Sequence, residues 1–142
     1  MPLLVDTGIL YALADRSDAW HATCVAFLAE ERERLLVPVT VLPEVTYLLQ
    51  SRLGGRAERA FVRSVVAREL DIEPLKDRDV SRAVEILERY PAIGFVDATL
   101  VAIAERLKLT RIATTDRRHF ARVSPAHIAA FDLVPDHRSG DF

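Results

Sequence analysis

The sequence predicts a single α/β domain with a mostly parallel central sheet of about five strands flanked by helices. Three observations support this class. The 142 residues are a one-domain length, and half of them are hydrophobic, which is enough for a core without a disulfide or metal staple. Short apolar runs alternate with stretches in which apolar residues recur at helical spacing. No internal repeat or linker divides the chain. We expect the domain to cover residues 1–134, followed by a polar tail over 135–142.

The first elements follow from apolar runs and capping residues. Residues 3–5 predict a buried strand that ends at Asp6, and residues 9–14 predict a short helix. Asp18 can cap a second helix. In that helix the apolar side chains at helical spacing are Trp20, Cys24, Phe27 and Leu28. We expect Cys24 to be a small buried side chain without a catalytic role.

The middle of the chain predicts a second strand and a helical hairpin. Residues 35–39 form the strand candidate, and Thr40 can cap a helix over 41–53. Pro43 falls in the first turn of that helix, where the missing N–H costs little. Two consecutive glycines then break the helix, and a further helix is predicted over 56–69.

The remaining elements continue the alternation. A strand is predicted over 71–75, followed by a helix that begins at Asp77 or Asp79. After Gly94 another helix opens at Asp97.

Two strand candidates close the domain. The first, 111–114, ends near Asp116 and precedes a short helix over 117–120. The second covers 128–133.

Composition excludes several classes of protein. One cysteine excludes an internal disulfide framework and any zinc site that needs two thiolates. No run of 18 apolar residues predicts a membrane span, and the N-terminus lacks the basic region of a signal peptide, so we expect a cytoplasmic protein without membrane association. The net charge of −2 gives no general signal for nucleic acid. Arginine supplies 17 of the 19 cations, which fits either phosphate binding or a GC-rich genome.

Four acidic residues stand out by position. Asp6 and Asp116 each follow a predicted strand, and Glu44 and Asp97 each lie at the start of a helix. In a right-handed parallel α/β sheet these positions share one edge, where ligands bind. Clustered carboxylates repel one another, and a hard divalent cation such as Mg²⁺ or Mn²⁺ relieves the repulsion. Each acid considered singly could equally be a helix cap or a helix-dipole partner.

Four segments carry a family resemblance. They are Leu4–Leu10, Val39–Val45, Gly94–Ala98 and Ala113–Phe120. In order and spacing they resemble the four motifs of PIN-domain ribonucleases, over roughly residues 3–134, and the chain is most similar to VapC toxins of bacterial type II toxin–antitoxin pairs.

The resemblance implies a Mg²⁺- or Mn²⁺-dependent endoribonuclease that hydrolyses structured RNA, commonly tRNA or a ribosomal RNA loop. It also implies a homodimer and a cognate VapB-type antitoxin. By the same resemblance Asp6, Glu44, Asp97 and Asp116 are the catalytic quartet. Asp6, Asp97 and Asp116 would hold the metal, and Glu44 would complete the metal shell or orient the attacking water. The expected products carry a 5′-phosphate and a 3′-hydroxyl.

Five further residues are candidates for supporting or RNA-contacting roles. Thr7 can hydrogen-bond the Asp6 carboxylate or cap the next helix, and Thr115 matches a position that is often Ser or Thr in the family. Arg117, Arg118 and His119 are candidates for phosphate contacts, with a solvated turn as the alternative for all of them. A second alternative for His119 is a role as proton donor.

Other classes fit the sequence less well. Receiver domains need an acidic pair near the first strand, dehalogenase-type phosphatases need an aspartate where Gly8 stands, and ribonuclease H folds begin with antiparallel strands. The remaining alternative is a PIN-fold module that binds RNA or protein without cleaving it. Metal binding discriminates between the two, because a scaffold has no use for the ion.

Overall fold

The computed structural model describes residues 1–136, which fold into five short strands and seven helices. The strands are β1 (Leu3–Val5), β2 (Leu35–Pro38), β3 (Asp71–Glu73), β4 (Arg111–Ala113) and β5 (Asp132–Val134). The helices are α1 (Thr7–Ala14), α2 (His21–Glu30), α3 (Val41–Leu53), α4 (Gly55–Val66), α5 (Asp77–Arg89), α6 (Phe95–Leu107) and α7 (Arg117–Ala121).

All strand pairs are parallel, and the order across the sheet is β3-β2-β1-β4-β5. The α/β class and the parallel sheet of five strands predicted from the sequence are therefore confirmed. The chain moves outward from β1 through β2 to β3, and then returns across the sheet to β4. The order thus reverses between β1 and β4, which is the topological switch point where open α/β sheets bind ligands.

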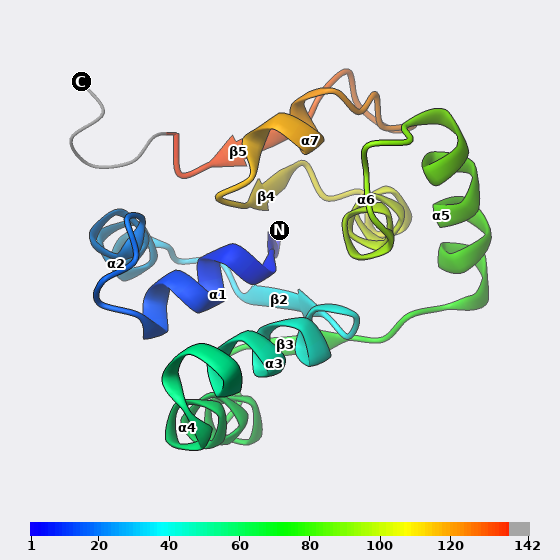
Figure 1. Ribbon diagram of the computed structural model, residues 1–142. Coiled ribbons are helices and arrows are strands. Elements are labelled where there is room, and N and C mark those ends of the chain that lie inside the picture. Colours follow the sequence, from blue (N-terminus) through cyan, green and yellow to red (C-terminus); the bar gives the residue numbers. More distant parts are fainter. Residues whose placement is uncertain (137–142) are drawn as a thin grey trace.

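Helices cover both faces of the sheet, with α1 and α2 on one side and α5 and α6 on the other (Figure 1). The three residues of β1 are fully buried, as expected for a central strand covered on both faces. α6 is buried from Ala98 through Glu105 and forms the centre of its layer. Cys24 is fully buried, as expected for a small apolar side chain; burial raises the pKa of its thiol to about 11.

Three local expectations were wrong in detail. Thr40 does not cap α3 with its side chain, because its hydroxyl pairs with the hydroxyl of Thr99 at 2.8 Å. α2 begins at His21, because the Asp18 carboxylate closes a preceding turn by accepting from the Trp20 amide at 2.8 Å. The last strand is Asp132–Val134 rather than 128–133, because only these residues reach the pairing register with β4.

Helix boundaries explain where two acids lie. α6 begins at Phe95 with Gly94 at the N-cap, so Asp97 is the third residue of the helix rather than its first. α5 begins at Asp77, one of the two predicted starts, and its third residue, Asp79, accepts a hydrogen bond from the Lys76 amide at 2.9 Å.

Within residues 1–136, the structure contains no helix of sufficient length and apolarity to cross a membrane. The division between a domain at 1–134 and a tail at 135–142 stays a prediction, since residues 137–142 lie outside the described part of the chain.

Candidate active site

One cleft of about 510 Å³ lies at the carboxyl edge of the sheet, and all four acids predicted from the sequence line it. Asp6 caps α1 directly after β1, and Asp116 precedes α7 after β4. Glu44 lies in the first turn of α3, and Asp97 lies in the first turn of α6. The cleft therefore spans the switch point, and its acids come from segments far apart in the sequence.

Asp6 is the most buried of these acids, with 6% of its surface exposed. Its carboxylate accepts hydrogen bonds from the Thr7 amide at 2.7 Å and from the Thr114 hydroxyl at 2.9 Å. Burial raises the pKa of Asp6 to about 7, with a further contribution from the negative charge of Asp97. The site thus holds a carboxylate whose charge is poorly solvated and only partly compensated.

Glu44 is exposed and reaches into the same cleft from α3. Its carboxylate accepts a short hydrogen bond from the Thr7 hydroxyl. Thr7 therefore connects Asp6, through its amide, to Glu44, through its hydroxyl.

Asp97, Asp116 and His119 form the tightest group of metal-ligand atoms among residues 1–136, with one atom of each lying within 4.8 Å of the others. The His119 Nδ1 lies 2.9 Å from an Asp116 oxygen and 3.4 Å from an Asp97 oxygen. This nitrogen is shielded from solvent and has no hydrogen-bond partner of good geometry. Burial raises the pKa of Asp97, and His119 opposes that shift.

These observations fit a divalent cation. A shielded imidazole nitrogen without a hydrogen-bond partner faces two carboxylates, and a third carboxylate nearby has a raised pKa. Carboxylate oxygens are the ligands that Mg²⁺ and Mn²⁺ prefer, and a positive ion would stabilise the ionised forms of Asp6 and Asp97. From the sequence, His119 was a candidate phosphate contact or proton donor, and its position beside the two carboxylates emerges from the structure.

Sequence reasoning missed Thr114, the residue that ties two acids together. Its hydroxyl donates to Asp6 and accepts from the Asp116 amide at 3.0 Å. The sequence also gave no indication that the site needs a residue without a side chain at the position of Gly8. A Cβ at this position would lie 2.2 Å from the Thr115 hydroxyl oxygen, so the glycine leaves room for Thr115 in the cleft. The sequence did contain a signal for Thr114, because a hydroxyl side chain directly after β4 lies at the carboxyl end of that strand, where the site is expected.

The cations predicted to contact RNA fall into different environments. Arg117 donates from one guanidinium nitrogen to the carbonyls of Leu133 and Pro135, at 2.8 and 2.9 Å, and so fastens α7 to the end of β5. Arg118 is exposed. Contact of either residue with RNA stays a prediction. Arg52, which the sequence analysis did not select, lines the acidic cleft with its guanidinium 5.1 Å from the centre of the Tyr11 ring.

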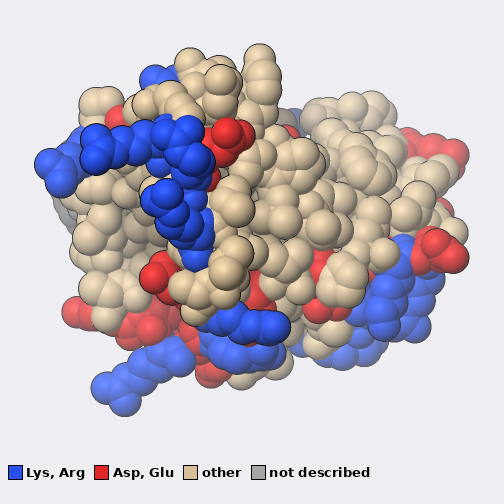
Figure 2. All heavy atoms as spheres, turned by 90° about the horizontal axis from the view of Figure 1, so that it is seen from below, with Lys and Arg blue, Asp and Glu red and all other residues tan. Residues whose placement is uncertain are grey.

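Figure 2 shows that arginine and lysine form several separate patches on the face seen from below, with uncharged and acidic atoms between them. This distribution agrees with the near-neutral overall charge. The face shown therefore offers a polyanion separate groups of cations rather than one broad basic surface.

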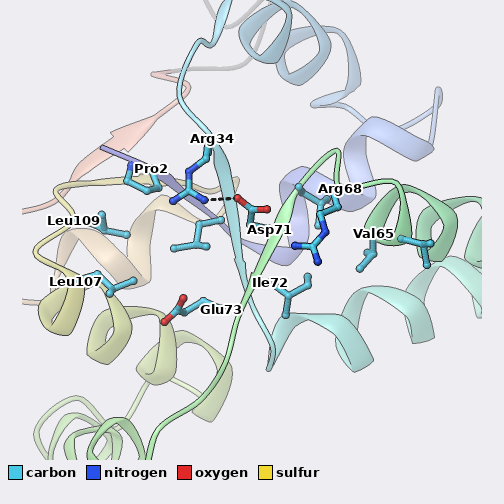
Figure 3. Close-up of a pocket in the computed structure, with 12 residues that line it drawn as sticks. Pro2, Arg34, Val65, Arg68, Asp71, Ile72, Glu73, Leu107 and Leu109 are labelled. Carbon is cyan, nitrogen blue, oxygen red and sulfur yellow. Dashed lines mark hydrogen bonds and ion pairs between the residues drawn. The ribbon is translucent and has the colours of Figure 1, made fainter.

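A larger cavity, of about 680 Å³, lies elsewhere. Figure 3 shows it beside β3, with Arg34 paired to Asp71. Pro2, Arg34 and Leu109 line it just before β1, β2 and β4, which places the cavity toward the amino ends of the strands. Because α/β sheets bind ligands at the opposite edge, the smaller acidic cleft is the better candidate site.

The sequence matches the family model of the PIN domain over residues 3–125. The chain belongs to the PIN domain family. The family resemblance noted in the four sequence motifs is thereby confirmed. A curated relative of this PIN domain is Ribonuclease VapC26 of Mycobacterium tuberculosis (strain ATCC 25618 / H37Rv), which is 29% identical over 135 residues. That match covers 94% of this chain and the whole of the relative.

Solved structures resemble this PIN domain over most of their length. VapC20 of Mycobacterium tuberculosis, described as a sarcin–ricin loop cleaving toxin, has a TM-score of 0.73 and 27% identity, with 78% of this chain and 86% of that chain covered. A toxin–antitoxin complex from Klebsiella pneumoniae has a TM-score of 0.71 and 18% identity, with 96% and 98% covered. At 18% identity, the similarity to the Klebsiella pneumoniae complex shows a shared fold alone.

Proposed function

We propose that this PIN domain is a metal-dependent endoribonuclease that acts as the toxin of a toxin–antitoxin pair. The observation that carries the proposal is the convergence of four carboxylates in one cleft at the switch point of the sheet. The similarity to Ribonuclease VapC26 along nearly the whole chain supports the same reaction class.

Each acid has a role that follows from its environment. Asp6, Asp97 and Asp116 would hold Mg²⁺ or Mn²⁺, with His119 beside the last two. When bound, such an ion neutralises charge on the phosphate and makes water a better nucleophile at neutral pH. Glu44 is exposed in the cleft and positioned by Thr7, so it is suited to orient the attacking water and accept its proton. Hydrolysis would leave a 5′-phosphate and a 3′-hydroxyl.

The proposed substrate is structured RNA, either tRNA or a loop of ribosomal RNA. One structural relative is described as cleaving the sarcin–ricin loop, which makes ribosomal RNA a specific candidate. The proposed partner is a VapB-type antitoxin, since similar folds occur in toxin–antitoxin complexes. We also propose that the protein forms a homodimer and is located in the cytoplasm, where these RNAs are found.

The alternative is a PIN-fold module that binds RNA or protein without cleaving it. The raised pKa values of Asp6 and Asp97 argue against this alternative. Keeping poorly solvated carboxylates together is unfavourable unless a cation or substrate uses them.

Cleavage of total RNA by the purified protein tests the proposal, with Mg²⁺ or Mn²⁺ compared with EDTA and the RNA ends mapped. We expect discrete cuts that require metal and disappear in Asp6→Asn and Asp97→Asn. Asp77→Asn is the matched control, because Asp77 is exposed at the start of α5, outside the cleft. Cuts that survive EDTA or both site variants would contradict the proposal, and absence of both cleavage and metal binding would favour the binding module.

A further inference from the structure

A second, smaller pocket adjoins the acidic cleft. It has a volume of about 190 Å³, and its lining comes from the end of α5, the segment before α6 and the region of α7. The lining residues are Arg89, Tyr90, Pro91, Ala92, Ile93, His119 and Arg122. His119 lines both spaces, so this pocket lies next to the cleft that holds Asp97 and Asp116.

The charge of the lining reverses across His119. The cleft on one side is lined by five carboxylates and one arginine, whereas the pocket on the other side is lined by two arginines and no acid. Arg89 and Arg122 are exposed, and neither guanidinium forms an ion pair within residues 1–136. Two arginines of the neighbouring α5–α6 layer are instead neutralised, because Arg82 and Arg106 each pair with carboxylates.

The pocket also offers a fixed aromatic surface. The Tyr90 hydroxyl accepts a hydrogen bond from the Ser124 amide at 3.1 Å, which holds the ring against the segment that follows α7. The Arg89 guanidinium lies 5.5 Å from the centre of this ring. A guanidinium held over an aromatic ring keeps its N–H donors available at the ring edge, where they can meet an anion.

We propose that this pocket is a subsite for the RNA strand and binds a phosphate, together with its ribose, next to the bond that is cut. The proposal rests on the proposed ribonuclease function. Unpaired guanidiniums bind phosphate by two-pronged hydrogen bonds, and the Tyr90 ring supplies apolar surface for the sugar or base. Because the pocket opens beside the acids, the phosphate that it binds and the phosphate that is cleaved belong to the same RNA strand. Arg89 and Arg122 are therefore positioning residues that fix the register of RNA over the cleft.

The test uses Arg89→Ala, Arg122→Ala and the double variant in the full chain. The substrate is a labelled RNA oligonucleotide spanning the mapped cut, assayed over a range of salt. We expect each single change to raise KM about tenfold, with kcat within about threefold, because a hydrogen bond to a charged group is lost without change at the acids. The salt dependence of log KM should weaken by about one unit of slope for each lost phosphate contact.

Two control variants distinguish a specific subsite from general electrostatic attraction between the protein and RNA. Arg63→Ala removes an equally exposed and unpaired arginine from α4, outside both spaces, and should leave KM within about twofold. Arg122→Lys should recover part of the lost affinity, because it restores the charge without the two-pronged geometry. Metal binding by the double variant should equal that of the wild type.

Three results with these variants would overturn the subsite. They are a KM unchanged in the double variant, an equal loss in Arg63→Ala, and a fall in kcat with weakened metal binding. Binding of unfractionated tRNA to the Asp97→Asn variant, with and without the arginine changes, keeps the test independent of cleavage. If the wild type cleaves nothing, the proposed function fails, whereas the tRNA measurement still decides the subsite. Equal displacement of tRNA by polyglutamate would also overturn it, since the pocket would then accept any polyanion.

Discussion

At the scale of single residues, Thr114 controls the geometry of two acids. Its hydroxyl donates to the Asp6 carboxylate and accepts from the Asp116 amide, so one oxygen joins the ends of β1 and β4. The Thr114 side chain is fully buried. We infer that the separation of Asp6 from Asp116 depends on this oxygen as much as on the sheet.

Thr114→Val should lower metal affinity or kcat by about 10- to 100-fold, the usual effect of losing a residue that orients a metal ligand. The acid limb of the pH–rate profile should also move to higher pH. The Thr114 hydrogen bond lowers the pKa of Asp6, so its removal raises that pKa further. Thr46→Val is the control, since the Thr46 hydroxyl bonds only to carbonyls of its own helix. An unchanged profile would contradict the role of Thr114.

Gly8 acts through the space that it leaves for Thr115. An alanine Cβ would lie 2.2 Å from the Thr115 hydroxyl oxygen, a contact that rotation of the threonine side chain relieves. Gly8→Ala and Thr115→Ala should therefore lower kcat by similar factors. The double variant should be no worse than either single variant, because each change removes the same hydroxyl from the cleft. Multiplicative effects would show that Gly8 has another function.

At the scale of elements, the α5–α6 layer holds the acid-bearing start of α6 in place. Arg106 of α6 is 5% exposed and pairs with Asp79, which is 1% exposed and caps α5. Arg106 also pairs with Glu73 at the end of β3. One buried guanidinium therefore links a strand and two helices, and so fixes the layer that carries Asp97 relative to the sheet.

Arg106→Met should destabilise the fold by about 3–5 kcal/mol, because it leaves Asp79 buried without its partner. Arg34→Met should cost about 1 kcal/mol or less, because the Arg34–Asp71 pair has an arginine side chain that is 68% exposed. Chemical denaturation measures both changes in the free energy of unfolding, from the midpoint and the slope of each transition. Equal losses of unfolding free energy in the two variants would contradict the importance assigned to the burial of the ion pair.

At the scale of the whole molecule, the acidic cleft makes the metal-free protein sensitive to pH. The pKa of Asp6 is raised from 3.8 to about 7. The folded state therefore binds a proton that the unfolded state has released between these values. Stability from this group is present below about pH 4 and is lost as the pH rises through 7. A raised pKa of Asp97 acts in the same direction.

In EDTA, Asp6→Asn should be more stable than the wild type at pH 8 by a few kcal/mol, since each pKa unit corresponds to about 1.4 kcal/mol. The difference should shrink toward pH 5. Added Mn²⁺ should raise the Tm of the wild type more than that of Asp6→Asn, because the ion offsets the same charge. Thermal unfolding across pH measures both effects, with Asp77→Asn as the control. A difference between wild type and Asp6→Asn that does not vary with pH would contradict the linkage.

The sequence alone determined the α/β class, the positions of most strands and helices, and the four acids that line the cleft. These features depend on local signals: short apolar runs, helical periodicity, and acids placed directly after strands or in first turns. Glu44 and Asp97 could be selected because they lie at helix N-termini, which in right-handed βα units meet the carboxyl edge of the sheet.

The tertiary structure decided what surrounds those acids. Thr114 meets Asp6 and Asp116 only because β4 lies beside β1, and strand order depends on long-range pairing that no local pattern encodes. Arg117 turned toward the end of β5, and His119 turned toward the acids, although they are two residues apart on one short helix. The pocket of Arg89 and Arg122 joins residues that are far apart in sequence. Such contacts follow from the packing of whole elements, and so they could be read only from the fold.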